Sequence, residues 1–368
     1  MQPIVLSIFR TLFLLALLIG FPTASPGMAG GQEQGTSEVG RQEVQRQPVT
    51  ELFSSDVPLQ FTLVADFQAL GRDRGQESEE RPALVYVNGF YGDRVGIPVD
   101  VKTRGTFRLQ EGICSDPPLR LDFPKSTTYG TVFDGQDKLK LVTHCRDTEE
   151  FQENVREEYL AYRILNLLSD VSFRVQLAEI TYIDTSGQNA PKTRVGFLLE
   201  DEDALADRLG GTLTEPSGLL PNQFVMDQIG LMYIFQYMVG NVDWATGASH
   251  NVLVLTRGEE HFPIPYDFDW TGLVDAPYAA PNRLTQEFHD TVRERVYWGI
   301  CMPGIDYAGL FARFNEQRAA ILALAEGAVG LSKPNADSAV EYLTEFFDVI
   351  NDPSRAQAEI IGACRPWL

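Results

Sequence analysis

The chain changes its hydrophobic pattern once, close to residue 201, and this change limits the architectures that it can form. Before that point, short runs such as Leu59 to Phe67 alternate apolar and polar residues, which is typical of antiparallel strands. After it, apolar residues follow the helical period, first from Asn222 to Val239. We therefore expect an α+β protein in which a β-rich lobe precedes a mainly helical lobe, with a cleft between them.

The β-rich lobe is expected over residues 51–205 and contains one long helix. The helix covers 151–170 and is capped by Asp147 or Thr148, with acidic residues in its first turn. The expected strands are 59–67, three strands within 83–107 around an Asn-Gly turn, 117–123, 137–145, 175–184 and 193–201. The second lobe, residues 206–368, is expected to contain helices at 222–239, 307–328, 337–350 and 353–363.

The first fifty residues are not expected to belong to the fold. An apolar run from Thr11 to Pro22 follows Arg10 and precedes small residues, which predicts a signal peptide over residues 1–29. An uncleaved membrane anchor is the alternative. Residues 30–50 have no aromatic side chain and no hydrophobic period, so we expect a disordered linker. The protein is then exported to the periplasm or the extracellular space, with no membrane contact once the signal peptide is removed.

Composition limits the partners. The chain has 368 residues, 44% of them hydrophobic, which is enough for one large core or two lobes and excludes a wholly disordered protein. Its formal net charge is −21, and a surface of that sign repels the phosphates of nucleic acid. We therefore expect no nucleic-acid partner.

Four cysteines follow the expected signal peptide, and an even number in an exported chain predicts two disulfides. Cys114 flanks the strand at 117–123 and Cys145 ends the strand at 137–145, so pairing of these strands would bring the two residues together. By elimination, Cys301 joins Cys364. The alternative is buried free thiols.

Residues 240–275 place oxygen-bearing side chains at turns between apolar runs. Asp243 and Asn251 precede a strand that begins at Val252, and Asp267 and Asp269 follow the second strand of the same hairpin. An Asp, an Asn and a second Asp in this arrangement can orient a nucleophile and hold Mg²⁺ or Mn²⁺ against phosphates. Asp269 is either a second metal ligand or a solvated turn residue, and Asp243 and Asn251 also suit simple turns.

Candidate cations come from the β-rich lobe. Lys138 and Lys140 are two residues apart, so they share one face of a strand. We expect Lys140 to pair with Glu158 of the long helix and to position phosphates, although strand lysines are often only solvated. Arg104, beside Gly105, either holds a phosphate or pairs with a carboxylate.

Several segments together resemble the CotH family of spore-coat protein kinases and its secreted bacterial relatives. The matching segments lie between about Glu51 and Ala280 and include VKTRGTFR, PPLRLDF, KLKLVTHCR, NVDW, HNVLVL and YDFDW. The resemblance implies a two-lobe, atypical protein-kinase-like fold that uses ATP and Mg²⁺. It implies Asp243 as the catalytic-loop Asp, Asn251 as the metal-binding Asn and Asp267 as the Asp that opens the activation segment.

Three functions remain open at this stage. The first is an exported phosphotransferase that moves phosphate from a nucleotide to a protein or a small hydroxylated acceptor. The second is a catalytically silent binding module at the cell envelope, which would show no response to nucleotide. The third is a metal-dependent phosphoester hydrolase that uses the carboxylates of Asp243, Asp267 and Asp269 without a nucleotide.

Overall fold

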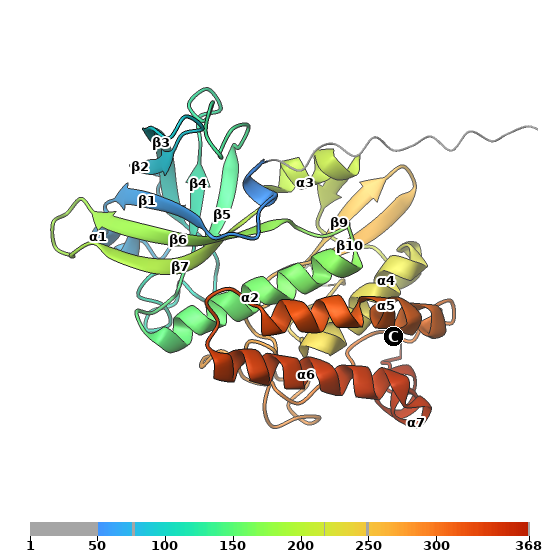
Figure 1. Ribbon diagram of the computed structural model, residues 1–368. Helices are drawn as coiled ribbons and strands as arrows, with labels where there is room; N and C mark the ends of the chain where they lie inside the picture. The colour runs from blue at the N-terminus through green and yellow to red at the C-terminus, as the bar shows by residue number, and fades with distance from the viewer. Residues whose placement is uncertain (1–50, 76–77, 217, 248–249, 367–368) are drawn as a thin grey trace, which may run out of the picture. The chain divides into compact units, whose positions relative to one another are not determined.

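Seven strands in the first half of the chain close into a barrel (Figure 1). The structure is a computed structural model that describes residues 51–75, 78–216, 218–247 and 250–366. The expected signal peptide (1–29) and linker (30–50) lie outside the described residues. The barrel strands are β1 (Leu59–Ala65), β2 (Arg81–Asn88), β3 (Arg94–Thr103), β4 (Leu119–Asp122), β5 (Lys138–Val142), β6 (Val175–Asp184) and β7 (Lys192–Leu199).

The expected two-lobe, kinase-like fold with an antiparallel N-lobe is wrong. Neighbouring strands around the barrel run in the order β1, β2, β3, β4, β5, β7, β6, and a parallel pairing of β1 with β6 closes the circle. That pairing extends from Leu59 opposite Ala178 to Ala65 opposite Asp184. An open sheet and a barrel both bury one face of each strand, so alternation along the sequence does not distinguish them. The three strands expected within 83–107 are also wrong, because β3 continues without interruption to Thr103 and the segment holds two strands.

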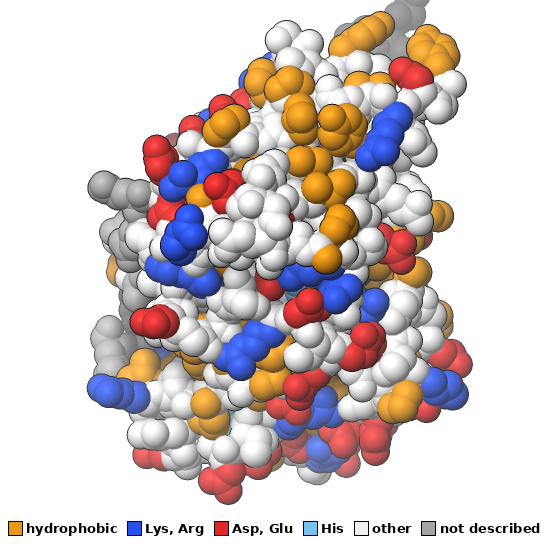
Figure 2. All heavy atoms as spheres, turned by 90° about the vertical axis from the view of Figure 1, so that its left-hand side faces the viewer, with side chains coloured by type: hydrophobic (Ala, Val, Ile, Leu, Met, Phe, Trp, Pro, Cys, Tyr) orange, Lys and Arg blue, Asp and Glu red, His pale blue; other side chains and the backbone are white. Residues whose placement is uncertain are grey.

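The barrel has a core of its own, built from inward-facing aliphatic residues. Leu63, Val85, Ile97, Leu121 and Leu139 are all fully buried in it. On the outside, Figure 2 shows hydrophobic side chains gathered over the barrel and charged side chains mixed below it. The exposed apolar residues of the barrel and its turns include Leu84, Phe90, Tyr91 and Tyr129.

A second core lies under the barrel, and strands β6 and β7 contribute to both. Leu198 points into the barrel, whereas its neighbours Phe197 and Leu199 pack with the helices. Helix α2 contacts these strands on one side and α5 on the other, and α5 packs against α6 (Figure 1). Both faces of β7 are therefore covered, which explains its continuous apolar run.

The long helices are close to those expected from the sequence, but the short helices at residues 67–72 and 202–209 were not expected. The helices are α1 (Phe67–Arg72), α2 (Glu149–Leu168), α3 (Glu202–Leu209), α4 (Met226–Val239), α5 (Tyr307–Glu326), α6 (Lys333–Asn351) and α7 (Pro353–Ala356), with short turns η1 (Glu51–Phe53), η2 (Pro221–Gln223) and η3 (Gln357–Ile361). Thr148 caps α2 by accepting a hydrogen bond from the backbone of Phe151, as one of the two expected caps. No helix among the described residues is long and apolar enough to span a membrane.

The hairpin expected after Asn251 forms and belongs to a small second sheet. Its strands are β8 (Thr212–Thr214), β9 (Val252–Arg257) and β10 (Glu260–Pro265), with β9 in the middle. Both expected disulfides are present, Cys114 with Cys145 and Cys301 with Cys364. Disulfides persist in oxidising compartments, so the two bonds fit an exported protein.

Candidate functional site

Helix α4 ends directly before the first group of site residues. The helix is buried from Ile229 to Val239 and ends at Gly240, which has a left-handed backbone with φ of 69°. A Cβ atom at Gly240 would lie 2.1 Å from the Tyr342 hydroxyl oxygen, so only glycine fits there. Beyond it, the indole of Trp244 donates a hydrogen bond to the carbonyl of Asn241 at 3.1 Å, which fixes the turn before Asp243.

Asp243, His250 and Asn251 form one hydrogen-bonded group, named here the Asp243 group. Asn251 donates from Nδ2 to the Asp243 carbonyl at 2.8 Å and to Asp243 Oδ2 at 3.1 Å. His250 Nε2 lies 2.9 Å from Asp243 Oδ1, and this hydrogen bond, together with the Asp243 charge, raises the pKa of His250. Asn251 has φ of 54°, an uncommon backbone state that the hairpin and these bonds hold in place.

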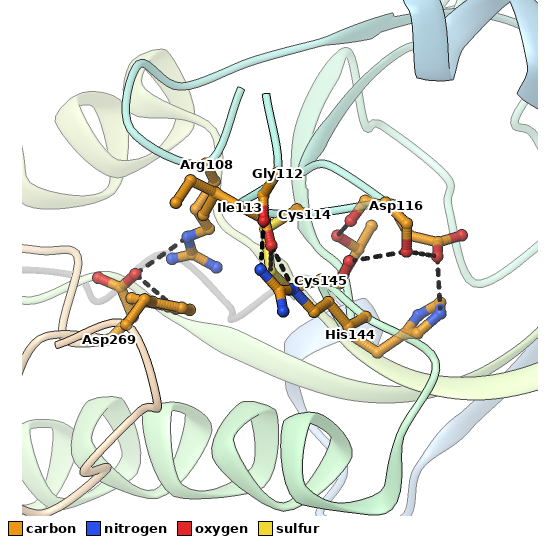
Figure 3. Close-up of a disulfide and its surroundings, with 12 residues drawn as sticks. Arg108, Gly112, Ile113, Cys114, Asp116, His144, Cys145 and Asp269 are labelled. Atoms are coloured by element: carbon orange, nitrogen blue, oxygen red, sulfur yellow. Dashed lines mark hydrogen bonds and ion pairs between the residues drawn. A yellow bond between two sulfur atoms is a disulfide. The ribbon is translucent and has the colours of Figure 1, made fainter. Parts of the chain in front are cut away.

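Asp267 and Asp269 follow β10 and meet an arginine that the sequence analysis did not select. Arg108 Nη2 lies 3.0 Å from Asp267 Oδ1, and Arg108 Nε lies 3.1 Å from Asp269 Oδ2 (Figure 3 shows the Asp269 contact). Arg108 Nη2 also lies 3.4 Å from Glu158 Oε2 on α2. We name Arg108, Glu158, Asp267 and Asp269 the carboxylate cluster.

The carboxylate cluster is buried except at Asp267, whose side chain is 43% exposed, and it has more acidic groups than basic ones. The side chains of Glu158 and Asp269 are 3% and 7% exposed. Burial raises the pKa of Glu158 to about 7 and that of Asp269 well above its usual range, against the lowering effect of Arg108. Glu158 Oε1 is buried and has no hydrogen-bond partner among the residues that the structure describes, so these residues leave one acceptor of the cluster unsatisfied.

Asp267 is held by its backbone as well as by Arg108. Its φ is 62°, and its backbone N–H donates to the Tyr162 hydroxyl at 2.8 Å. Tyr278 similarly donates its hydroxyl to Asp269 Oδ2 at 2.8 Å. These contacts orient both carboxylates before any ligand binds.

Lys140 is not paired with Glu158 as expected; its ammonium group instead forms an ion pair with Glu202 at the start of α3. The reason is the barrel register: Lys140 lies opposite Leu199 of β7, and Glu202 follows only three residues later. Burial lowers the pKa of Lys140, and the nearby Arg104 charge lowers it further, while Glu202 and Asp267 raise it. Lys140 is therefore within electrostatic reach of Asp267.

Arg104 lies in the same region and retains an unused donor. Burial lowers its pKa, as does Arg108, while Asp267 raises it. Its Nε is buried and has no hydrogen-bond partner in the described part of the chain. The ammonium group of Lys138, by contrast, has no hydrogen bond or ion pair with any residue that the structure describes, although its backbone pairs with β4.

The oxygen atoms of the candidate site are of the kinds that coordinate Mg²⁺. Asn251, Asp267 and Asp269 carry the amide and carboxylate oxygens that this ion prefers, and Glu158 adds an unsatisfied oxygen. Within the described residues there is no group of three or more His, Cys, Asp or Glu side chains arranged to hold a metal. Arg108 lies between the two aspartates, so a metal would have to share or replace its contacts.

Sequence reasoning missed Arg108 and Glu202. Arg108 ends the segment VKTRGTFR, so a signal for it was present, but its role depends on contacts with residues more than a hundred positions away. Glu202 stands in an acidic loop that looks solvated in sequence.

No family model and no curated protein matches this chain. The resemblance to the CotH family therefore stays a prediction.

Proposed function

We propose that this protein transfers a phosphoryl group from ATP to a protein or small hydroxylated acceptor, with Mg²⁺ or Mn²⁺, as its resemblance to the CotH family suggests. The main support is that Asp267, contributed from beyond β10, lies within electrostatic reach of Lys140 and Arg104 from the barrel. Phosphoryl transfer depends mostly on such positioning of cations and carboxylates around the phosphates.

The cations have a reason to bind phosphate. Burial and the Arg104 charge both lower the pKa of Lys140, while its ion pair with Glu202 raises it. A phosphate oxygen between the two cations would relieve their repulsion and would accept from the unused Nε of Arg104. We assign these two residues to phosphate binding.

Asp267 and Asn251, with Asp269 beside them, are the residues that would hold the metal. Bound Mg²⁺ supplies positive charge that offsets the charge on the transferring phosphoryl group. Asp267 is pre-oriented for this by its backbone hydrogen bond to Tyr162 and its unusual φ.

Asp243 is the residue that we assign to the acceptor. Its carboxylate is held from two sides by His250 and Asn251, and its side chain is 28% exposed, so an acceptor hydroxyl can reach it. A carboxylate fixed in this way can orient that hydroxyl and take its proton. His250 then serves to hold Asp243 rather than to act as the base.

The direct test is to measure nucleotide binding with and without metal by calorimetry and thermal shift, using residues 30–368 and the variant Asp267→Asn. We expect ATP to bind only with Mg²⁺ or Mn²⁺ and the variant to lose most of this binding. A folded protein with no nucleotide response would instead favour the silent binding module. Metal-dependent cleavage of a phosphoester without nucleotide would favour the hydrolase.

A further inference from the structure

Arg108 lies on an irregular segment, residues 104–117, that connects β3 to β4 and is anchored at its far end. The Cys114–Cys145 disulfide ties this segment to the chain that follows β5 (Figure 3). Around the disulfide, the backbone N–H of Asp116 donates to the Cys145 carbonyl at 2.9 Å, and Arg146 Nε donates to the Ile113 carbonyl at 2.6 Å. Cys145 has φ of 55°, so the backbone there has an uncommon conformation that the disulfide and these bonds hold.

The near end of the same segment packs against the chain beyond Asp269. The ring of Phe107 lies 5.0 Å from that of Trp270 and 5.6 Å from that of Tyr278, and Leu109 is buried. Arg108 is therefore fixed between an aromatic contact on one side and a disulfide on the other. The Arg108 side chain is only 10% exposed, so the residues packed around it fix its position.

The position of the Arg108 guanidinium resembles that of a bridging cation. It contacts one oxygen of Asp267 and one of Asp269 at 3.0 and 3.1 Å, and it adds a longer contact to Glu158. The cluster has three carboxyl groups and one guanidinium, with the Arg104 charge acting on Glu158 as well, and Glu158 Oε1 has no hydrogen-bond partner among the described residues. A divalent cation in place of the guanidinium would bring one more positive charge to these acids.

We propose that Arg108 occupies the place between Asp267 and Asp269 that a divalent cation takes, and that the Cys114–Cys145 disulfide positions it there. Arg108 is then a positioning residue that keeps the two carboxylates together without metal and competes with metal for them. This competition lowers the affinity of the site for the free metal ion. The ion then binds tightly only when phosphate oxygens also coordinate it. The role of nucleotide rests on the proposed function, but the competition with metal does not.

The test measures Mn²⁺ binding alone, without nucleotide, by electron paramagnetic resonance at pH 8. Arg108→Gln removes the competing charge with little change of size, and we expect it to bind Mn²⁺ about 10-fold more tightly than the wild type. Arg108→Lys keeps a single charge but not the fork that reaches both aspartates, so we expect an intermediate affinity. Unchanged or weaker Mn²⁺ binding in Arg108→Gln would overturn the proposal.

The disulfides provide a matched pair of variants for the second half of the proposal. We expect Cys114→Ser/Cys145→Ser to tighten Mn²⁺ binding, by less than Arg108→Gln, because Arg108 is then held less firmly. Cys301→Ser/Cys364→Ser removes the other disulfide and should leave the Mn²⁺ affinity as in the wild type. Equal effects in the two double variants would mean that the Cys114–Cys145 bond has no special role at the site.

Folding of each variant is checked first by circular dichroism. If Arg108→Gln does not fold, Arg108→Lys and the cysteine pairs decide the question. If Mn²⁺ binds and tightens as expected but no variant responds to nucleotide, the proposed function fails while the role of Arg108 stands. If the wild type binds Mg-ATP but Arg108→Gln and Arg108→Lys do not tighten Mn²⁺ binding, the role of Arg108 fails while the proposed function stands.

Discussion

The two halves of the candidate site differ in how the protein treats their charge. In the carboxylate cluster, Glu158 and Asp269 are 3% and 7% exposed and Asp267 is 43% exposed, and an internal arginine joins all three. In the Asp243 group, Asp243 is 28% and His250 53% exposed, and the contacts of Asp243 with His250 and Asn251 organise the side chains. The first half holds an internal cation against two buried acids, whereas the second has no arginine or lysine in its contacts with the described residues. Under the proposed function, the first half binds the metal and phosphates and the second meets the acceptor.

The largest expected effect concerns the two disulfides, of which Cys114–Cys145 holds the segment that carries Arg108 of the carboxylate cluster. Removing either disulfide should lower the free energy of unfolding by about 4 kcal/mol, slightly more for Cys301–Cys364, because it closes the longer loop. Urea unfolding of the two double-serine variants measures this. A Cys114→Ser/Cys145→Ser protein that is as stable as the wild type would mean that the segment carrying Arg108 is held without its disulfide.

The next effect concerns the open half. Asp243→Asn should reduce turnover by about 100-fold while leaving Mg-ATP affinity nearly unchanged, because Asp243 acts on the acceptor mainly in the transition state. Asp267→Asn should instead weaken Mg-ATP binding itself. Both affinities and phosphate-transfer rates are measured at the same salt and pH. Equal loss of binding in the two variants would make Asp243 a metal ligand and remove the distinction between the halves.

A smaller effect tests how the open half is held. Gly240→Ala should destabilise the protein by about 2 kcal/mol, because its Cβ would meet the Tyr342 hydroxyl in a left-handed backbone. Gly258→Ala, on the β9–β10 turn, is the control: it has a similar φ of 63° but nothing within 4 Å of the added carbon. We expect it to cost about 1 kcal/mol. Thermal unfolding compares the two, and equal losses would show that the contact with Tyr342 is not a constraint.

The last effect concerns a buried acid beside the carboxylate cluster but outside it. Burial raises the pKa of Glu157 on α2 to about 7, so the folded state holds a proton that the unfolded state releases near pH 4.5. The folded protein therefore loses stability as pH rises from about 4.5 to about 7. Glu157→Gln should remove this loss, so the stability of the variant relative to the wild type should be higher at pH 8 than at pH 4.5, by at most about 3 kcal/mol.

Denaturant unfolding of the wild type and Glu157→Gln at both pH values checks this prediction, with Mn²⁺ affinity as the second measurement. An unchanged difference between the proteins across this range would show that Glu157 is ionised in the fold. A change in Mn²⁺ affinity would place Glu157 within the carboxylate cluster after all.

Much of the site's local geometry was predictable. Asp243, Asn251 and Asp267 flank a short hairpin, so neighbouring residues along the chain decide their turns, and the hairpin forms as expected. The pairing of Lys140 with Glu158 was not predictable in this way and is wrong. Which helix residue meets a strand lysine depends on strand register, and in the barrel β5 pairs with β7, which leads to Glu202.

The sequence by itself determined most of the strands, the long helix α2, the hairpin and the disulfide partners, because each depends on periodicity or on a few neighbouring residues. Tertiary structure alone decided that β1 pairs in parallel with β6 and closes the barrel. It also brought Arg108 to Asp267, 159 positions along the chain, with Asp269 beside it. Such contacts depend on how whole elements pack and on the energy of burying charge, and no local pattern in the chain records either.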